Sequence, residues 1–515
     1  MDPLSDLRAA IGEKARLERP PKPDFGDYST NAAMLRAPTE GKPPREVAAG
    51  LAEELKKRLG DDVERIDVAG PGFLNLFMSD AWFRRMLATA LEQGEEFGRG
   101  SGGERVLVEF VSANPTGPMT VASARGAAIG DSLSRVLEFA GGDVEREYYI
   151  NDYGTQVRLF GESIRARARG EEPPEGGYQG DYVAQLAAEI DGAGEKDPEE
   201  LALLGVERMM SRVEETLTRF RVRFDRFFSE RSMHEGHAIE AALKVMAEHG
   251  HVYEHDGATW LRTTSLGDDK DRVLVRSSGE KTYFASDIAY HDDKRRRGYD
   301  RVINVLGADH HGHVKRMMAA WQLLGGGEGA FEILIMQLVN LMEGGERARM
   351  SKRQGEFVTL DDLLDDIGVD AARFFLLQRS HDTTIDLDLA LAREQSSDNP
   401  VYYCQYAHAR IASILRRADA EPDASVAAEL HPSEEALIKR LLAFPEEVQL
   451  AAERRAPHRL TVYVPELAQD FSAVYRDCKV VGTPEEGFRL ALALQTQRVI
   501  ARALDVLGVE APQEM

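Results

Sequence analysis

The chain has 515 residues, of which 43% are hydrophobic and 30% charged, a composition typical of a folded protein with several domains. Its 64 basic and 88 acidic residues give a formal net charge of −24, which argues against non-specific nucleic-acid binding but not against a local basic face. Two distant cysteines, Cys404 and Cys478, exclude a disulfide framework and a four-cysteine zinc site, and they fit a reducing cytoplasm. We expect no signal peptide and no membrane span.

The first part of the chain, residues 1–98, is expected to form a small α+β domain. Residues 47–59 place apolar side chains at helical spacing, and residues 73–77 alternate as a strand does. Residues 93–103 are rich in glycine, which is typical of a linker. We therefore place a domain boundary close to residue 100.

The middle part, residues 104–387, has the order of strand, loop, helix and strand that indicates a parallel sheet. A helix is expected from Ala124 to Ala140, with Ser123 at its N-cap position. Residues 160–250 are polar and mostly helical, which indicates an insertion. Apolar runs predict strands at 105–111, 145–150, 273–275, 301–306 and 331–336. This pattern predicts an α/β domain with a Rossmann-like parallel sheet.

From residue 388 onward the strand signals nearly vanish. Helical periodicity predicts helices at 397–417, 433–453, 459–477 and 485–507. Residues 388–515 are therefore expected to form an all-α bundle.

Three segments gather side chains suited to binding and catalysis: 108–118, 282–291 together with 307–313, and 349–355. Glu109 and Asn114 lie at the carboxyl end of the first strand of the middle part, where open parallel sheets bind ligands. Tyr283 and Asp287 are four residues apart at a strand-to-helix turn, so both can face one site.

With these segments the chain resembles the arginyl-tRNA synthetases, a family of class I aminoacyl-tRNA synthetases. Residues 25–31 and 71–75 are similar to the family's N-terminal domain, and residues 395–410 to the start of its helical anticodon-binding domain. The resemblance implies ATP-dependent joining of L-arginine to tRNA(Arg), with Mg²⁺ accompanying the ATP and no tightly bound cofactor. We expect a cytoplasmic monomer without membrane contact.

The resemblance also implies an arginine pocket. A pocket for a guanidinium and an ammonium group needs carboxylates and amide oxygens. The residues carried over to it are Glu109, Ser112, Asn114, Tyr283 and Asp287. Tyr283 is expected to cover the arginine side chain.

Residues Met350, Ser351 and Lys352 resemble the family's KMSKS loop, with Arg349 in place of its first lysine. We expect Lys352, assisted by Ser351, to neutralise charge on the ATP triphosphate as the pyrophosphate leaves. Met350 is expected to contact ATP.

Gly307, Asp309 and His310 resemble the family's loop on the nucleotide side, where Asp309 accepts a ribose hydroxyl. The histidines at 310, 311 and 313 do not predict a metal site, because their spacing places them on different sides of a turn.

The chain departs from its family after Pro118, where the HIGH motif belongs. The four positions are Thr120, Val121, Ala122 and Ser123, so both histidines and the glycine are absent. Those histidines normally hydrogen-bond the α-phosphate, and losing one such donor costs about 3 kcal/mol, or ~10²–10³ in rate. Pro118 and Ala122 remain expected contacts of ATP.

Thr120 and Ser123 still carry hydroxyl donors, and the following helix offers free backbone amides to a phosphate. Arg125, His310 and His313 are further candidate sources of positive charge. We therefore expect an active enzyme with a variant HIGH site. The alternative is a tRNA- or arginine-binding paralogue that no longer makes adenylate; a different class I synthetase is disfavoured by Glu109, Tyr283 and Asp287.

For tRNA we expect contacts from Tyr402, Tyr406, Arg410 and Arg476, because tyrosines stack on unpaired bases and arginines bind phosphates. Tyr403 and Tyr475 fit helix packing as well as base stacking. Other basic residues available in this region are Arg416, Arg417, Arg454, Arg455 and Lys479.

Overall fold

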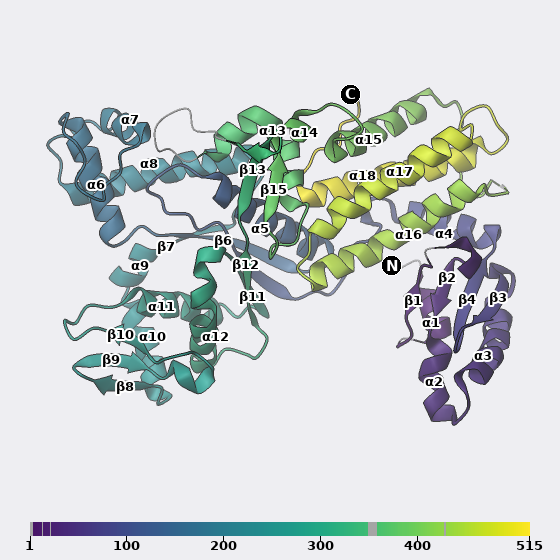
Figure 1. Cartoon of the computed structure of the whole chain (residues 1–515), viewed down its shortest axis with the longest axis horizontal. Coiled ribbons are helices and arrows are strands. Elements are labelled where there is room, and N and C mark those ends of the chain that lie inside the picture. The colour runs from purple at the N-terminus through teal and green to yellow at the C-terminus, as the bar shows by residue number, and fades with distance from the viewer. Residues whose placement is uncertain (1–3, 13, 21, 349–357, 427–428) are drawn as a thin grey trace.

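The computed structural model describes residues 4–12, 14–20, 22–348, 358–426 and 429–515. Its N-terminal part, purple in Figure 1, contains an antiparallel sheet in the order β1-β2-β4-β3. The elements are α1 (Ser5–Ile11), β1 (Leu17–Glu18), β2 (Tyr28–Thr30), α2 (Ala32–Glu40), α3 (Pro44–Leu59), β3 (Val63–Ala69), β4 (Phe73–Met78) and α4 (Asp80–Gln93). The predicted helix at 47–59 and strand at 73–77 are confirmed as α3 and β4.

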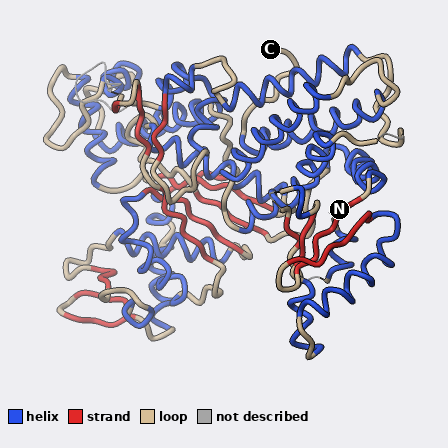
Figure 2. The backbone as a smooth tube through the Cα atoms, turned by 45° about the vertical axis from the view of Figure 1, so that its right-hand side comes forward, coloured by secondary structure: helices blue, strands red, loops and turns tan. Residues whose placement is uncertain are grey.

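A parallel sheet with the order β12-β11-β5-β6-β7 forms the centre of the molecule (Figure 2). Its strands are β5 (Arg105–Glu109), β6 (Asp143–Ile150), β7 (Arg226–Ser229), β11 (Arg301–Gly307) and β12 (Phe331–Met336). The chain builds the sheet outward from β5 in one direction and from β11 in the other. The carboxyl ends of β5 and β11 therefore flank the switch point where sheets of this kind bind ligands.

Residues 160–250 are mostly helical, as expected, but they also contain β7, an edge strand of the central sheet. The helices are α6 (Thr155–Ala168), α7 (Asp181–Glu189), α8 (Pro198–Arg219), α9 (Glu230–Glu235) and α10 (Ala238–Glu248). The sequence did not predict β7 because the strand has 4 residues and buries only Phe228 among them.

The strand expected at 273–275 exists, but it belongs to a different sheet. β10 (Arg272–Val275) pairs antiparallel with β9 (Ala258–Leu261), which pairs antiparallel with β8 (Val252–His255). The connections between these strands are too short for the crossover that parallel strands need. The chain then returns to the central sheet through α11 (Tyr283–Arg296), β11, the 3₁₀ helix η5 (Ala308–His313) and α12 (Val314–Leu323).

A third small sheet, in the order β14-β13-β15, lies near the centre of Figure 1. It comprises β13 (Val339–Glu343), β14 (Glu346–Arg347) and β15 (Ile385–Asp388), and α13 (Leu360–Leu377) and α14 (Leu389–Arg393) accompany it. These strands were not predicted from the sequence: β13 and β14 contain no fully buried side chain, and β15 alternates buried and exposed residues over only 4 positions.

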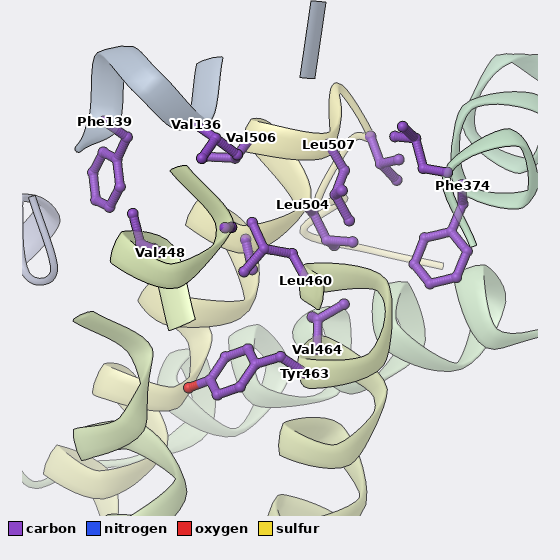
Figure 3. Packing of buried hydrophobic residues seen from close by; sticks show 14 of the residues in the cluster. Val136, Phe139, Phe374, Val448, Leu460, Tyr463, Val464, Leu504, Val506 and Leu507 are labelled. Atoms are coloured by element: carbon purple, nitrogen blue, oxygen red, sulfur yellow. The ribbon is translucent and has the colours of Figure 1, made fainter. Parts of the chain in front are cut away.

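The expected C-terminal helices are confirmed as α15 (Pro400–Arg417), α16 (Pro432–Glu453), α17 (His458–Asp477) and α18 (Glu486–Leu507). Figure 3 shows their core, where Val448, Leu460 and Leu504 lie close to Val136 and Phe139 of α5 (Val121–Phe139). The bundle therefore shares its apolar core with the helices that cover the central sheet. No helix within the described ranges has the length and apolar character needed to cross a membrane.

Candidate active site

The candidate site begins where β5 ends. Glu109 is the last residue of β5 and is buried, while Val111 and Ser112 have positive φ angles of 67° and 43°. Ser112 Oγ donates a hydrogen bond of 2.9 Å to Glu109 Oε1 and accepts one of 3.2 Å from the amide of Tyr149 in β6. Left-handed backbone at residues other than glycine costs energy and is found often at functional sites. This turn places two of the predicted pocket residues side by side.

A buried lysine, Lys294 of α11, pairs with Glu109. Its Nζ lies 2.5 Å from Glu109 Oε2 and donates a hydrogen bond of 2.9 Å to Asn304 Oδ1 in β11. Both oxygens of Glu109 are therefore bonded, which fixes the direction of the carboxylate and supports its charge away from water. Lys294 was not predicted from the sequence, because it is one of several basic residues at the end of α11 and lies 185 residues from Glu109 along the chain.

Tyr283 and Asp287 lie one turn apart at the start of α11. Tyr283 is 69% exposed, whereas Asp287 is half-buried. Burial raises the pKa of Asp287 to about 7; the positive charge of Arg316 opposes this shift and the negative charge of Glu109 adds to it. Glu109 and Asp287, chosen from separate segments of the sequence, thus lie close enough for the charge of Glu109 to act on Asp287.

Glu230 joins this group and was not predicted. It is the first residue of α9, directly after β7, and it is buried. Burial raises the pKa of Glu230 to about 7, and the charges of Asp287 and Asp152 contribute. A group of carboxylates that raise one another's pKa values is stabilised when a cation binds between them. Its position directly after β7 could have identified Glu230 as a site residue, but only if β7 had been predicted from the sequence.

A cavity of about 370 Å³ opens beside these carboxylates, and its lining includes Glu230, Lys281, Tyr283 and Ser286. Asn114, the remaining predicted pocket residue, is exposed and makes no hydrogen bond within the part of the chain that the structure describes. The structure thus shows a hydrogen bond between Ser112 and Glu109 and places Asp287 within electrostatic reach of Glu109. Asn114 makes no hydrogen bond to these residues in the described ranges and is exposed.

The helix that follows the variant HIGH segment, α5, begins earlier along the chain than the sequence predicted. α5 starts at Val121 with Thr120 at the N-cap, so Ser123 lies inside the first turn and the N-cap expectation for Ser123 is wrong. Backbone pairing explains the shift: Thr120 forms a β-bridge with Thr359, and the amide of Val121 donates a bond of 3.2 Å to the carbonyl of Val358. The Thr120 side chain makes no capping bond, so its hydroxyl stays available to a ligand.

The first turn of α5 presents an open end. Ala122 is exposed and Ser123 is partly exposed. Backbone amides in the first turn of a helix have no partner within the helix and attract anions. Pro118, just before this turn, is also exposed.

Arg125, expected as a source of charge for the phosphate, is instead buried and bonded to backbone. Its guanidinium donates to the carbonyl oxygens of Gln337, Ser380 and Thr383 at 2.6, 3.0 and 2.7 Å. Burial lowers its pKa to about 10. These bonds hold the segments that precede β13 and β15 against α5, so Arg125 cannot also reach a phosphate, and that expectation is wrong.

The nucleotide-side loop is η5, which follows Gly307 at the end of β11. The side chain of Asp309 is 82% exposed, and its Oδ2 lies 3.5 Å from Nε2 of His310. The His310 and His313 ring centroids are 5.5 Å apart. No group of three or more His, Cys, Asp and Glu side chains in the described ranges is arranged to hold a metal ion. Met350, Ser351 and Lys352 lie outside the described residues.

Aromatic and basic side chains gather on α15 and α17. The Tyr402 and Tyr406 rings stack at 6.3 Å, and Arg410 Nη2 donates a bond of 2.8 Å to the Tyr406 hydroxyl. The Arg410 guanidinium also lies 4.6 and 4.9 Å from the ring centroids of Tyr406 and Tyr475. A cavity of about 490 Å³ lies beside this group. Arg476 is exposed and pairs with its neighbour Asp477.

Two residues considered for tRNA contact are used inside the protein. The Tyr403 hydroxyl donates a bond of 3.1 Å to Ser472 Oγ, so Tyr403 packs α15 against α17. Arg455 donates two bonds of 2.9 Å to the Glu332 carboxylate and joins the bundle to β12. Tyr475, in contrast, is 45% exposed and keeps a free face.

Comparisons with known proteins agree along the whole chain. Family models match as "Arginyl tRNA synthetase N terminal domain" over residues 3–78, "tRNA synthetases class I (R), catalytic domain" over 86–171 and 193–411, and "DALR anticodon binding domain" over 404–515. An arginine–tRNA ligase of Frankia alni is 45% identical over 99% of this chain and 96% of that protein. One of Bacillus subtilis is 45% identical over 99% of this chain and 97% of that protein.

Among solved structures, the arginyl-tRNA synthetase of Thermus thermophilus is similar with a TM-score of 0.80 and 25% identity, covering 99% of both chains.

Proposed function

The chain belongs to the arginyl-tRNA synthetase family of class I, and from this premise we propose that it joins L-arginine to tRNA(Arg) with ATP, releasing AMP and pyrophosphate. The observation that carries the proposal is the acidic cluster of Glu109 at the end of β5, Glu230 directly after β7 and Asp287 near the start of α11. A cationic amino acid is the substrate that such a cluster favours. We also propose a cytoplasmic monomer divided at residues 1–98, 104–387 and 388–515.

In the amino-acid pocket, Asp287 and Glu230 bind the cationic groups of arginine. Both carboxylates have raised pKa values in the free protein, and a bound cation stabilises their charged forms. Glu109 and Ser112 shape the pocket wall, because their side chains are bonded to each other and to Lys294 and Tyr149. Tyr283 covers the opening, and Asn114 approaches the substrate from the exposed side.

At the nucleotide side, Thr120, Ser123 and the first amides of α5 donate hydrogen bonds to the α-phosphate, with Pro118 and Ala122 against the nucleotide. Gly307, Asp309 and His310 bind the adenosine. Lys352, assisted by Ser351, neutralises charge on the triphosphate as the pyrophosphate leaves, and Met350 contacts ATP; Mg²⁺ bound with the ATP would add to this neutralisation. The arginine carboxylate then attacks the α-phosphate in line, without a covalent enzyme intermediate.

For tRNA, Tyr402, Tyr406 and Arg410 form the anticodon-facing surface, with Arg476 beside it. Exposed rings next to a guanidinium suit stacked bases and their phosphates. Although the net charge is −24, tRNA binding is therefore expected to weaken as salt rises. Arg410→Gln should lower the slope of log affinity against log salt by about 1. A slope unchanged from the parent would remove Arg410 from the contact surface.

The test of the proposed function is aminoacylation with labelled arginine and its cognate tRNA. Arginine-dependent exchange of pyrophosphate into ATP, with tRNA present, measures the first step separately. We expect both activities. A protein that binds tRNA but shows neither activity would be a non-catalytic paralogue.

A further inference from the structure

Arg316, near the start of α12, is a partly buried arginine without a partner. Its Nε is shielded from solvent and makes no hydrogen bond, and within the described part of the chain its guanidinium makes no ion pair. Its Cζ lies 5.8 Å from the Phe284 ring centroid. Other buried arginines are committed: Arg373 to Asp131, and Arg125 to backbone carbonyls. Six other arginines also have a buried Nε without a hydrogen bond, but each of them donates through its Nη atoms, which Arg316 does not do within the described ranges.

The surroundings of Arg316 favour an added anion. Burial first, and then the positive charge of Arg272, lowers the pKa of Arg316, while the charges of Asp287, Asp268 and Asp269 act in the opposite direction without reversing the shift. Arg272 is itself held by Asp268 at 2.7 Å, so it contributes repulsion without offering a partner. Since a guanidinium stays protonated in proteins, Arg316 remains a cation that has no hydrogen-bonded anion.

Arg316 adjoins both the proposed nucleotide site and the proposed amino-acid pocket. α12 follows η5, which carries the proposed adenosine contacts Asp309 and His310. On the other side, the charge of Arg316 is felt by Asp287 of the amino-acid pocket. Arg316 therefore adjoins both proposed substrate sites, and the arginine carboxylate has to meet the α-phosphate where those two sites join.

We propose that Arg316 binds the α-phosphate of ATP and supplies the positive charge that the absent HIGH histidines would otherwise bring. This inference rests on the proposed function. A carboxylate oxygen of arginine forms a bond to the α-phosphorus while the bond from that phosphorus to the pyrophosphate oxygen breaks, and the electron pair leaves with pyrophosphate. No proton is transferred. Arg316 stays protonated and stabilises the negative charge on the non-bridging oxygens.

Three variants test the role: Arg316→Gln, Arg316→Lys and the control Lys315→Gln, which removes the same charge from the exposed neighbour on the same helix. The measurement is arginine-dependent pyrophosphate exchange with tRNA present, resolved into kcat and the KM for arginine. We expect Arg316→Gln to lower kcat at least ~10²-fold, as loss of one preorganised donor does. The KM for arginine should change little, because the loss of Arg316 removes a repulsion of the cationic substrate but also lets the pKa of Asp287 rise further.

Arg316→Lys should retain most of the rate, since a lysine still offers a point charge to phosphate, and Lys315→Gln should match the parent. Exchange by Arg316→Gln within about threefold of the parent overturns the inference, as does a higher arginine KM with unchanged kcat. If thermal melting shows that Arg316→Gln is unfolded, the test rests on Arg316→Lys. An exchange rate in that variant as low as the rate without enzyme overturns the inference. An inactive parent instead defeats the proposed function.

Discussion

The amino-acid side and the nucleotide side of the site are built differently. Glu109 on the amino-acid side has both oxygens bonded by the protein before any ligand is present. On the nucleotide side, the Thr120 hydroxyl makes no capping bond, Asp309 is exposed and Arg316 makes no ion pair among the described residues. Specificity for a cation requires carboxylates that are held apart in advance, whereas phosphate binding leaves donors free until the ligand supplies the acceptors.

The largest effect is expected from breaking the prearranged side at Lys294. Lys294→Met leaves the buried Glu109 charge without its partner, which costs about 3–5 kcal/mol of unfolding free energy. Urea denaturation measures it, and the double variant Glu109→Gln/Lys294→Met should recover part of the loss. Stability equal to the parent in Lys294→Met would show that the pair does not hold this side together.

The next effect concerns the free donors of the nucleotide side. Replacing both Thr120 and Ser123 with alanine should lower kcat for aminoacylation at least ~10²-fold, because two neutral donors to the α-phosphate are lost. Arginine affinity should hardly change, since the pocket is separate. If the double variant charges tRNA as fast as the parent, the donors lie elsewhere, and Arg316 and Lys352 become the leading candidates.

A smaller effect, confined to the amino-acid side, is expected at Asp287. Asp287→Ala removes a charge-assisted bond worth about 1.5–3 kcal/mol, so the arginine KM should rise ~10- to 150-fold while the ATP KM stays nearly constant. Glu248→Ala, at an exposed carboxylate on α10, is the matched control. An arginine KM equal to that of the control would remove Asp287 from the pocket.

The smallest effect is a dependence on pH. The pKa of Asp287 is raised to about 7 in the free protein, so part of the carboxylate is protonated at neutral pH. Arginine binds the ionised form, and the arginine KM should therefore rise as pH falls below 7, by up to about tenfold per pH unit for each proton displaced. Steady-state kinetics between pH 6 and about 8.5 measure this. Asp287→Asn should make the profile shallower and leave the contribution of Glu230, whose pKa is also raised to about 7; a profile as steep as that of the parent assigns the proton to another group.

The sequence predicted those helices and site residues that depend on the spacing of residues close together along the chain. Apolar periodicity located the C-terminal helices, and the four-residue spacing at a predicted strand-to-helix turn indicated that Tyr283 and Asp287 can face one site; both lie near the start of α11. Lys294 could not be found in this way, because its partner is 185 residues distant and its neighbours are equally basic. Glu230 was missed because β7 is too short to show a pattern. The start of α5 was misplaced because it depends on pairing with Val358 and Thr359, a tertiary contact.

That pairing has a consequence for how this segment tolerates change over evolution. Two main-chain bonds form the bridge between Thr120 and Thr359: the amide of Val121 donates to the carbonyl of Val358 at 3.2 Å, and the amide of Leu360 donates to the carbonyl of Met119 at 2.8 Å. Neither bond depends on side-chain identity. The helix start therefore keeps its place whichever residues occupy positions 120, 122 and 123. Histidines at positions 120 and 123 and a glycine at 122 would fit the same backbone, so we expect substitutions there to change the chemistry of the site more than its architecture.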